Sequence, residues 1–358
     1  MDAFRVVVVD DSALFRMALR NVLTEIPGCE VVASVAEGKS ALEKIEQLRP
    51  DLVTLDLEMP DMDGIGVLRE LRRRKLDAKV VMISRFTTAG AQVTTDALIE
   101  GAFDFVLKPS GKDPAENKRN LRQALEERIT ALRDRTVVSS EPGASSTTRK
   151  TQSVASAPPC DAVFIGCSTG GPDALARIIP DLPGNFPVPI FIVQHMPDGF
   201  TASLAARLNE ASALEVIEAH NGLIARGGQV VLARGGRHLK ILRQVAGGVA
   251  VQLTEDPPLH SCRPAVDYTL RSAHDVLSGR MLVAILTGMG RDGMEGCQLV
   301  RASGAYVIAQ QADGCTVYGM PKAVIAAGLA DQIVKLPAIA GALTRAIESA
   351  ISAKSSRS

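Results

Sequence analysis

Short apolar runs alternate with longer amphipathic segments along the N-terminal part of the chain. The runs lie at Arg5–Val9, Val31–Val35, Leu52–Leu55, Val80–Ile83 and Phe103–Leu107. The segment SALFRMALRNVLTEI, which follows the first run, repeats apolar residues at helical spacing. Five strand–helix repeats of this kind predict an α/β unit with a doubly wound parallel sheet that helices cover on both faces.

The C-terminal part of the chain repeats this alternation. Strand-like runs lie at Ala162–Ile165, Ile190–Val193, Gln229–Leu232, Leu282–Leu286 and Tyr306–Ala309. The segment HLKILRQVAGGVAVQLTED contains two alternating runs around a Gly-Gly pair, which predict a β-hairpin. We therefore expect a second α/β unit, a doubly wound and mostly parallel sheet with a hairpin insertion.

A change in composition separates the two units. Residues 136–159 read TVVSSEPGASSTTRKTQSVASAPP, which is rich in Ser, Thr, Ala and Pro and contains no aromatic residue. Such a segment buries too little apolar surface to order itself, so it predicts a flexible linker. The predicted organisation is an N-terminal domain at 1–135, this linker, and a C-terminal domain at 160–352, both of ordinary domain size.

Composition narrows the classes of function. The 40 Lys and Arg residues balance 40 Asp and Glu residues, and this zero net charge argues against a nucleic-acid binder. The chain shows no signal-peptide pattern and no apolar run of ~18 residues, so we expect a cytoplasmic protein without membrane insertion. Its six cysteines include no Cys-x-x-Cys pair, which predicts free thiols rather than a zinc site.

Polar side chains follow the apolar runs of the N-terminal domain. They stand at the ends of its first, third, fourth and fifth runs: Asp10, Asp11, Asp56, Ser84 and Lys108. Because the carboxyl ends of parallel strands meet at one edge of a sheet, we expect these side chains to converge. Three carboxylates in one cleft favour Mg²⁺, and one of them could take up a phosphoryl group as an aspartyl phosphate.

Each acid taken alone fits a solvated loop residue, and a dinucleotide-binding fold would need glycines where the chain has DDSALF. The combination, over roughly residues 3–125, resembles the receiver domain of two-component response regulators, a flavodoxin-like fold. The resemblance implies that Asp56 is the phosphoacceptor and that a histidine kinase is the phosphodonor. It further implies a Mg²⁺ site formed by Asp10, Asp11 and Asp56. The phosphate-sensing residues that it implies are Ser84, Phe105 and Lys108.

A glycine-rich turn ends the first apolar run of the C-terminal domain. GCSTG, residues 166–170, fits the G-x-S-x-G pattern, in which a serine nucleophile lies at a strand–helix turn. The pattern alone is weak, and a tight structural turn is the alternative. A phosphate loop does not fit, because the lysine of the G-K-[ST] motif is absent. Ser168 is thus a candidate nucleophile that needs a base.

The candidate base is His195, which directly follows an apolar run in FIVQHMP. It is therefore expected at the same sheet edge as Ser168, whereas the other four histidines fit structural or surface positions. Asp292, in the turn TGMGRDG after a later run, could orient the imidazole, although an aspartate there also fits a helix N-cap. The chain order Ser-His-Asp differs from the Ser-Asp-His order of α/β-hydrolases.

Several motifs carry a second resemblance. GCSTGG, QHMP, GGRH, RPAVD, TGMGRDG and YGMP resemble the protein-glutamate methylesterase domain of CheB-type chemotaxis proteins, over roughly residues 160–350. The resemblance implies hydrolysis of glutamyl methyl esters on the cytoplasmic domains of chemoreceptors, often with deamidation of receptor glutamines, and no cofactor for the esterase reaction. It implies a catalytic triad of Ser168, His195 and Asp292 and oxyanion-binding backbone amides at Thr169 and Met289.

The same resemblance suggests that the unphosphorylated receiver domain docks over the esterase site and that phosphorylation releases it. Three features depart from the family's usual pattern. Cys262 precedes Arg263 where the family more often has histidine, Arg234 stands where it usually has proline, and ISRFTTAG at the fourth run of the N-terminal domain is less typical. These departures bear on the substrate, which could be a receptor of another chemosensory pathway. The alternative function is a response regulator whose output domain binds a partner without catalysis.

Overall fold

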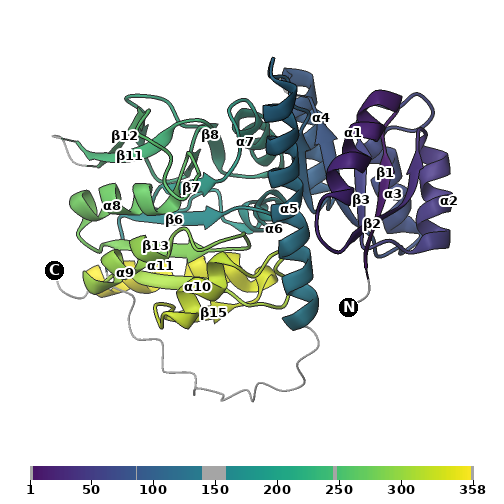
Figure 1. Ribbon diagram of the computed structural model, residues 1–358. Helices are drawn as coiled ribbons and strands as arrows, with labels where there is room; N and C mark the ends of the chain where they lie inside the picture. Colours follow the sequence, from purple (N-terminus) through teal and green to yellow (C-terminus); the bar gives the residue numbers. More distant parts are fainter. Residues whose placement is uncertain (1–2, 86, 139–158, 245–247, 356–358) are drawn as a thin grey trace. The chain divides into compact units, whose positions relative to one another are not determined.

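Two compact units make up the chain, Met1–Val138 and Ser139–Ser358. The computed structural model describes residues 3–85, 87–138, 159–244 and 248–355. Each unit is an α/β unit built on a parallel sheet, which confirms the predicted fold class (Figure 1). No helix within the described ranges has both the length and the hydrophobicity needed to cross a bilayer.

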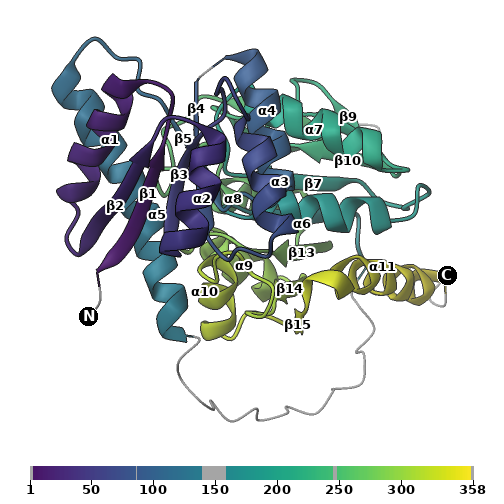
Figure 2. The same ribbon diagram turned by 90° about the vertical axis from the view of Figure 1, so that its right-hand side faces the viewer.

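The N-terminal unit alternates strands and helices along its whole length. In chain order they are β1 (Phe4–Val9), α1 (Ala13–Thr24), β2 (Cys29–Val35), α2 (Gly38–Leu48), β3 (Leu52–Asp56), α3 (Gly64–Arg73), β4 (Lys79–Ser84), α4 (Thr88–Ile99), β5 (Asp104–Leu107) and α5 (Pro114–Val138). The strands form one parallel sheet in the order β2-β1-β3-β4-β5. Helices α1 and α5 cover one face of this sheet, and α2, α3 and α4 cover the other (Figure 2).

Burial explains why the strands of this unit read as continuous apolar runs. Residues 6–9 of β1 are fully buried, as expected for a parallel strand that is covered on both faces.

Helix α5 differs from the expectation, because it continues to Val138 and takes in the first three residues of the predicted linker. Good helix formers in ALEERITALRDR carry the helix past the change in composition. Residues 139–158 of the predicted linker lie outside the described residues.

The C-terminal unit is larger and contains two sheets. In chain order its elements are β6 (Ala162–Cys167), α6 (Gly171–Ile178), β7 (Ile190–Gln194), α7 (Phe200–Ala211), β8 (Glu215–Glu218), β9 (Ile224–Ala225), β10 (Gln229–Leu232), β11 (His238–Arg243), β12 (Val249–Thr254), α8 (Val266–Leu277), β13 (Met281–Ile285), α9 (Met294–Ala302), β14 (Tyr306–Gln310), α10 (Met320–Ala326), β15 (Gln332–Val334) and α11 (Ile339–Ser355). The large sheet is parallel, in the order β15-β14-β13-β6-β7-β10-β8.

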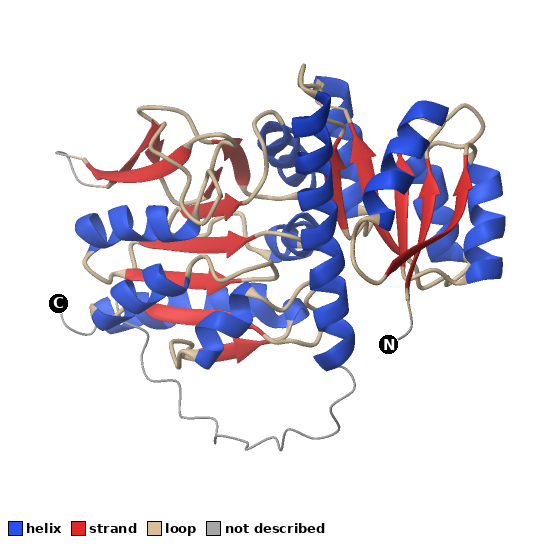
Figure 3. Ribbon diagram, viewed as in Figure 1, coloured by secondary structure: helices blue, strands red, loops and turns tan. Residues whose placement is uncertain are grey.

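The predicted hairpin is confirmed as β11 and β12, which pair antiparallel and join β9 in a small third sheet (Figure 3). Its turn at Gly247 lies outside the described residues. One buried apolar cluster connects the large sheet with the hairpin and with α8, α9 and α10. The sequence pattern does not predict β8, β9 and β15, because strands of two to four residues carry almost no alternation.

Both parallel sheets have a position from which the chain winds outward in opposite directions. In the N-terminal sheet it lies between β1 and β3, and in the large C-terminal sheet between β6 and β13. Connections diverge there and leave a crevice at the carboxyl ends of the strands, which is where ligands bind in folds of this class. The candidate residues lie at the carboxyl ends of these strands and of their neighbours β4, β5 and β7, so the topology brings them to one sheet edge within each unit.

Candidate functional site

An acidic cluster lies at the crevice of the N-terminal unit. Asp10 directly follows β1, and Asp56 is the last residue of β3. Both are buried, whereas Asp11 beside them is exposed, and oxygen atoms of all three lie within 4.8 Å of one another. The Lys108 ammonium group lies 2.7 Å from a carboxylate oxygen of Asp10 and 2.7 Å from one of Asp56.

The electrostatics of this cluster are unbalanced. Burial raises the pKa of Asp56 to about 6, and the nearby Asp10 charge adds to this, while Lys108 opposes it. One lysine thus contacts two buried carboxylates, and its single positive charge leaves the cluster with excess negative charge. Mg²⁺ takes oxygen ligands at ~2.0–2.1 Å and is commonly bound by carboxylates. Three carboxylates this close, with a surplus of negative charge, fit that ion.

The phosphate-sensing candidates lie around the cluster. The Ser84 hydroxyl is buried at the end of β4 and accepts a 2.7 Å hydrogen bond from Thr94. Phe105 is a buried residue of β5, in register with Met82 of β4. The Ser84 hydroxyl also donates to the Arg85 carbonyl at 3.2 Å. The predicted roles of Ser84 and Phe105 concern the phosphorylated form and stay predictions.

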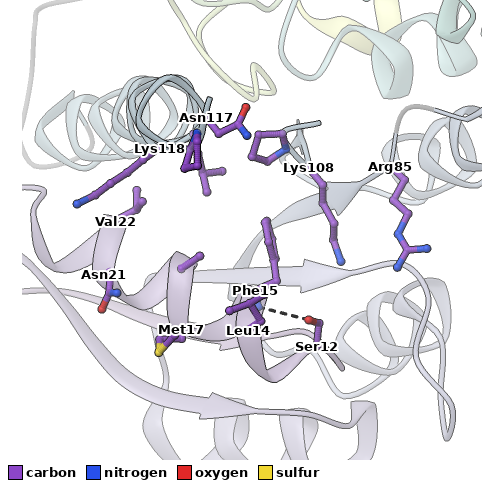
Figure 4. A pocket seen from close by; sticks show the side chains of 14 residues that line it. Ser12, Leu14, Phe15, Met17, Asn21, Val22, Arg85, Lys108, Asn117 and Lys118 are labelled. Carbon is purple, nitrogen blue, oxygen red and sulfur yellow. Dashed lines mark hydrogen bonds between the residues drawn. The ribbon is translucent and has the colours of Figure 1, made fainter. Parts of the chain in front are cut away.

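A groove of about 630 Å³ opens beside Lys108, between α1 and α5. Figure 4 shows the Phe15 ring next to the Lys108 side chain, and the ammonium group lies 4.9 Å from the ring centroid. Leu14 and Met17 on the same groove are 73% and 56% exposed. The acidic cluster is therefore bordered by an apolar, open surface.

The candidate nucleophile lies at a strand–helix turn in the C-terminal unit. Strand β6 ends at Cys167, and Ser168 follows it with its backbone N–H donating to the Thr287 carbonyl at 3.0 Å. Gly170, at φ 78°, is the N-cap of α6 and uses a left-handed conformation that favours glycine. A Cβ atom on Gly170 would collide with Thr316, so the glycine also admits a close neighbour.

The candidate base and carboxylate are in direct contact. His195 follows β7, and its Nε2 lies 2.7 Å from Oδ2 of Asp292. Backbone N–H groups of Val266, Asp267 and Gly293 donate to the Asp292 carboxylate at 2.7, 2.9 and 2.9 Å. Two of these donors belong to the first turn of α8, where helix amides are free to bind an anion. The carboxylate is therefore held by main-chain atoms rather than by a flexible partner.

Charges in this pair stabilise each other. Burial by itself would lower the pKa of His195, but the hydrogen bond and charge of Asp292, with a contribution from Cys262, raise it overall. Burial would raise the pKa of Asp292, yet His195 and the backbone donors lower it overall. The site thus favours a carboxylate that stays ionised and an imidazole that becomes positively charged easily, as a general base in acyl transfer must.

The second ring nitrogen of His195 has an unexpected neighbour. Its Nδ1 lies 3.4 Å from the Cys262 sulfur. Among the residues that the structure describes, no hydrogen bond joins the Ser168 hydroxyl to this imidazole. The structure therefore places Ser168 at the same crevice as the His195–Asp292 pair but does not close the triad. Catalytic hydrogen bonds often tighten only when substrate is bound.

Gln194 is a residue that sequence reasoning missed. It ends β7 and is almost fully buried, and its Nε2 donates to the Ser168 carbonyl at 3.0 Å and to the His195 carbonyl at 3.2 Å. Gly171 packs so closely on this amide that a side chain there would displace it. One amide thus fixes the two turns that carry the candidate nucleophile and the candidate base. Its position directly before His195 was the only signal in the sequence.

The oxyanion candidates lie on turns packed against Ser168. Thr169 follows it directly, and its carbonyl accepts a 2.9 Å hydrogen bond from the Thr287 hydroxyl. Gly288 lies so close to Ser168 that an added Cβ would be 2.8 Å from the serine Cβ, which brings the turn that carries Met289 next to the candidate nucleophile. Both turns border the site, and the role of their amides stays a prediction.

Comparisons with known proteins extend this picture. Residues 163–343 match the family model of the CheB methylesterase, and residues 6–125 match that of the response regulator receiver domain. A protein-glutamate methylesterase/protein-glutamine glutaminase of Desulfotalea psychrophila is 42% identical, over 97% of this chain and 100% of that protein. One of Archaeoglobus fulgidus is 41% identical, over 96% and 98%. The CheB methylesterase catalytic domain of Thermotoga maritima is 44% identical with a TM-score of 0.51, and the match covers 53% of this chain and 98% of that one.

The fold, the two sites and these matches define a class, a response-regulator receiver domain joined to a hydrolase domain. The chain belongs to the CheB family of protein-glutamate methylesterases/protein-glutamine glutaminases. A receiver domain of this type implies phosphorylation by a kinase. The acidic cluster of Asp10, Asp11 and Asp56 is consistent with a Mg²⁺ site in that domain.

Proposed function

We propose that Ser168, His195 and Asp292 hydrolyse glutamyl methyl esters on the cytoplasmic domains of chemoreceptors. The observation that carries this proposal is the His195–Asp292 contact of 2.7 Å at the crevice where β6 delivers Ser168. A buried carboxylate held by three backbone amides has a clear use in orienting a base. As a helix N-cap alone, Asp292 would not need His195.

The reaction assigns one atom to each role. The Ser168 Oγ attacks the ester carbonyl carbon, and its proton moves to Nδ1 of His195, because Nε2 is engaged by Asp292. The carbonyl oxygen gains negative charge, which the backbone amides of Thr169 and Met289 bind. One such donor is worth about 2.7–4 kcal/mol in the transition state. The carbon–oxygen bond to the methoxy group then breaks, and His195 returns the proton so that methanol leaves.

Water completes the cycle. His195 takes a proton from water, the hydroxide attacks the acyl-enzyme, and the Ser168 oxygen leaves with the proton, which releases a glutamate side chain. A glutamine side chain follows the same path with ammonia in place of methanol. The two activities of the family therefore use one set of residues, and product analysis for methanol and ammonia separates them.

The receiver domain is proposed to regulate this activity through Asp56, phosphorylated by a chemotaxis histidine kinase. Mg²⁺, when bound, would be held by Asp10, Asp11 and Asp56 and would neutralise charge on the phosphoryl group. Lys108, whose ammonium group already contacts Asp56, and Ser84 would then bind the phosphoryl oxygens. Phe105 would report the change to the surface of the domain.

We further propose that the unphosphorylated receiver domain, residues 1–135, inhibits the catalytic domain, residues 160–352, by docking on it through the linker. The family resemblance and the Ser- and Pro-rich composition of residues 139–158 support this arrangement. Removal of residues 1–150 should then raise methylesterase activity. Activity that stays the same or falls would rule out inhibition by docking.

The test of the whole proposal is methanol release from membranes that carry methylated chemoreceptors, with and without Mg²⁺ and a small phosphodonor. Release should rise with the phosphodonor, vanish in Ser168→Ala and lose its stimulation in Asp56→Asn. If Asp56 is phosphorylated but several receptors release no methanol, the output domain has another substrate or binds a partner without catalysis.

A further inference from the structure

A cysteine occupies the free side of the candidate catalytic base. The Cys262 sulfur lies 3.4 Å from Nδ1 of His195, while Nε2 of the same ring lies 2.7 Å from Asp292. Thiol, imidazole and carboxylate are thus in the order that activates cysteine nucleophiles, since the imidazole can accept the thiol proton and the carboxylate stabilises the resulting charge. The hydrolase mechanism does not use this thiol.

The backbone around Cys262 holds the sulfur in place. Leu259 and Cys262 exchange two backbone hydrogen bonds, of 3.1 and 2.9 Å, across a two-residue turn. The two residues of the turn, His260 and Ser261, have φ values of 52° and 60°, which is uncommon and costly for residues other than glycine. The His260 ring is tied to Asp267 at 2.9 Å. A strained turn with an anchored side chain therefore fixes the thiol against the imidazole.

Cys262 also differs from the other cysteines in access and partners. Cys167, Cys297 and Cys315 are buried, whereas Cys262 is half-buried. Cys29 and Cys160 have similar exposure, but burial raises the pKa of both thiols, that of Cys160 to about 12. Among the described cysteines, Cys262 is the one whose sulfur contacts a histidine ring. It combines solvent access with a base that can remove its proton.

We propose that Cys262 is a modification site for peroxides and soft carbon electrophiles, and that its modification stops the esterase. With hydrogen peroxide, the sulfur attacks one peroxide oxygen, the O–O bond breaks, and the sulfur is oxidised to a sulfenic acid while the peroxide is reduced to water. The thiol proton passes through Nδ1 of His195 to the leaving hydroxide. With iodoacetamide, the thiol proton passes to Nδ1 of His195, an S–C bond forms, the C–I bond breaks, and iodide leaves.

Inhibition follows from the position of the sulfur. An oxygen or acetamide group on Cys262 would lie against Nδ1, the nitrogen that must take the proton of Ser168. The modified chain would keep its fold and its His195–Asp292 pair but lose the base for the serine. This part of the inference rests on the proposed function, whereas the reactivity of the thiol does not.

The first experiment measures reactivity without any substrate. The full chain is treated with iodoacetamide, and labelling of each cysteine is followed by mass spectrometry. Cys262 should be labelled at least about tenfold faster than Cys29 and Cys160, because the His195 imidazole beside its sulfur can accept the thiol proton. His195→Gln should slow the labelling of Cys262 and leave that of the other two unchanged. Equal rates for the three cysteines, or no effect of His195→Gln, would overturn the proposal.

The second experiment links reactivity to turnover. Wild type, Cys262→Ser and the double variant Cys29→Ser/Cys160→Ser are treated with peroxide, and methanol release is compared with that of the same untreated chain. Wild type and the double variant should lose activity and regain it with dithiothreitol, while Cys262→Ser keeps its own starting activity. Equal inactivation of Cys262→Ser would contradict inhibition through this residue. If the hydrolase proposal itself is wrong, none of the untreated chains will release methanol. The labelling rates of the first experiment would still test the reactivity of Cys262.

Discussion

Two aspartates are buried at the crevices of their sheets, Asp56 at the end of β3 and Asp292 in the turn after β13, and their surroundings differ in kind. Asp56 faces a second carboxylate, Asp10, and shares one lysine with it. Asp292 receives three backbone N–H donors and a histidine. The pKa of Asp56 is raised to about 6, mainly by burial, whereas that of Asp292 is lowered because His195 and the amides outweigh burial.

In the proposed function, this difference separates a reactive carboxylate, Asp56, from an orienting one, Asp292. A carboxylate surrounded by excess negative charge attracts a cation. With that cation bound, it can accept a phosphoryl group. A carboxylate held by main-chain donors stays ionised and keeps one direction, which a catalytic imidazole requires. Under the proposed function, the same sheet-edge geometry supports a phosphorylation switch in one unit and a rigid catalytic pair in the other. The partners of each aspartate make the difference.

The largest effect is expected from breaking the rigid pair. Asp292→Asn puts an amide in place of the carboxylate that accepts from His195 Nε2–H. The imidazole is then no longer held in the tautomer with its proton on Nε2, and its positive charge is no longer stabilised. Methanol release should fall about 10⁴-fold in kcat. Asp161→Asn is the charge-matched control, because its partner Arg280 lies at the opposite end of β13. A loss of only a few-fold in Asp292→Asn would show that the pair does not orient a base.

Removing the shared lysine breaks the other site. In Lys108→Met, Asp10 and Asp56 would face each other without a cation, and loss of one partner from a buried ion pair costs about 3–5 kcal/mol. Calorimetry of the full chain at neutral pH without Mg²⁺ should show the receiver transition at lower temperature. Lys118→Met, which removes the exposed pair with Glu25, is the control and should cost less than about 1 kcal/mol.

The pH dependence of Lys108→Met has a defined sign. A carboxyl whose pKa is higher in the folded state than in the unfolded state stabilises the fold below the unfolded pKa. That stability is lost as pH rises through the folded pKa. Without Lys108, the pKa of Asp56 should rise further, so acidification should restore part of the lost stability and Mg²⁺ should restore part of it at neutral pH. A deficit that is independent of both would point to lost packing instead.

The sequence predicts those parts of the sites that depend on local patterns, and it misses those that depend on contacts between residues far apart in the chain. The ends of strands are visible in local sequence, so Asp10, Asp56, Ser168 and His195 were expected at the carboxyl edges of the two sheets. The fold class followed from the alternation of apolar runs with amphipathic segments. The position of Cys262 against His195 joins residues 67 apart through a strained turn, and no local pattern encodes that. The short strands β8, β9 and β15 exist because the sheet pairs with them, not because their residues alternate.

A smaller effect concerns competition between protons and Mg²⁺ at the acidic cluster. Because the pKa of Asp56 is raised to about 6, a cation must displace a proton below that pH. Calorimetric titration should show Mg²⁺ affinity falling by up to about tenfold per pH unit below this pKa and levelling off above it. Asp56→Asn should bind Mg²⁺ more weakly and with a flatter pH dependence over this window. A steep dependence that survives in Asp56→Asn would assign the titration to another group.

The smallest effect is expected from removing a helix N-cap, a feature in which the two units also differ. In the receiver unit, Asp63 caps α3 by accepting a 2.7 Å hydrogen bond from Gly66 N–H. In the catalytic unit, α6, α7 and α9 begin at Gly170, Gly199 and Gly293 with no side-chain cap. Asp63→Ala should lower receiver stability by about 1 kcal/mol, seen as a lower Tm of the receiver transition. Asp63→Asn keeps a capping oxygen and should retain most of that stability. An equal loss in both variants would assign the effect to the charge of Asp63 rather than to its capping oxygen.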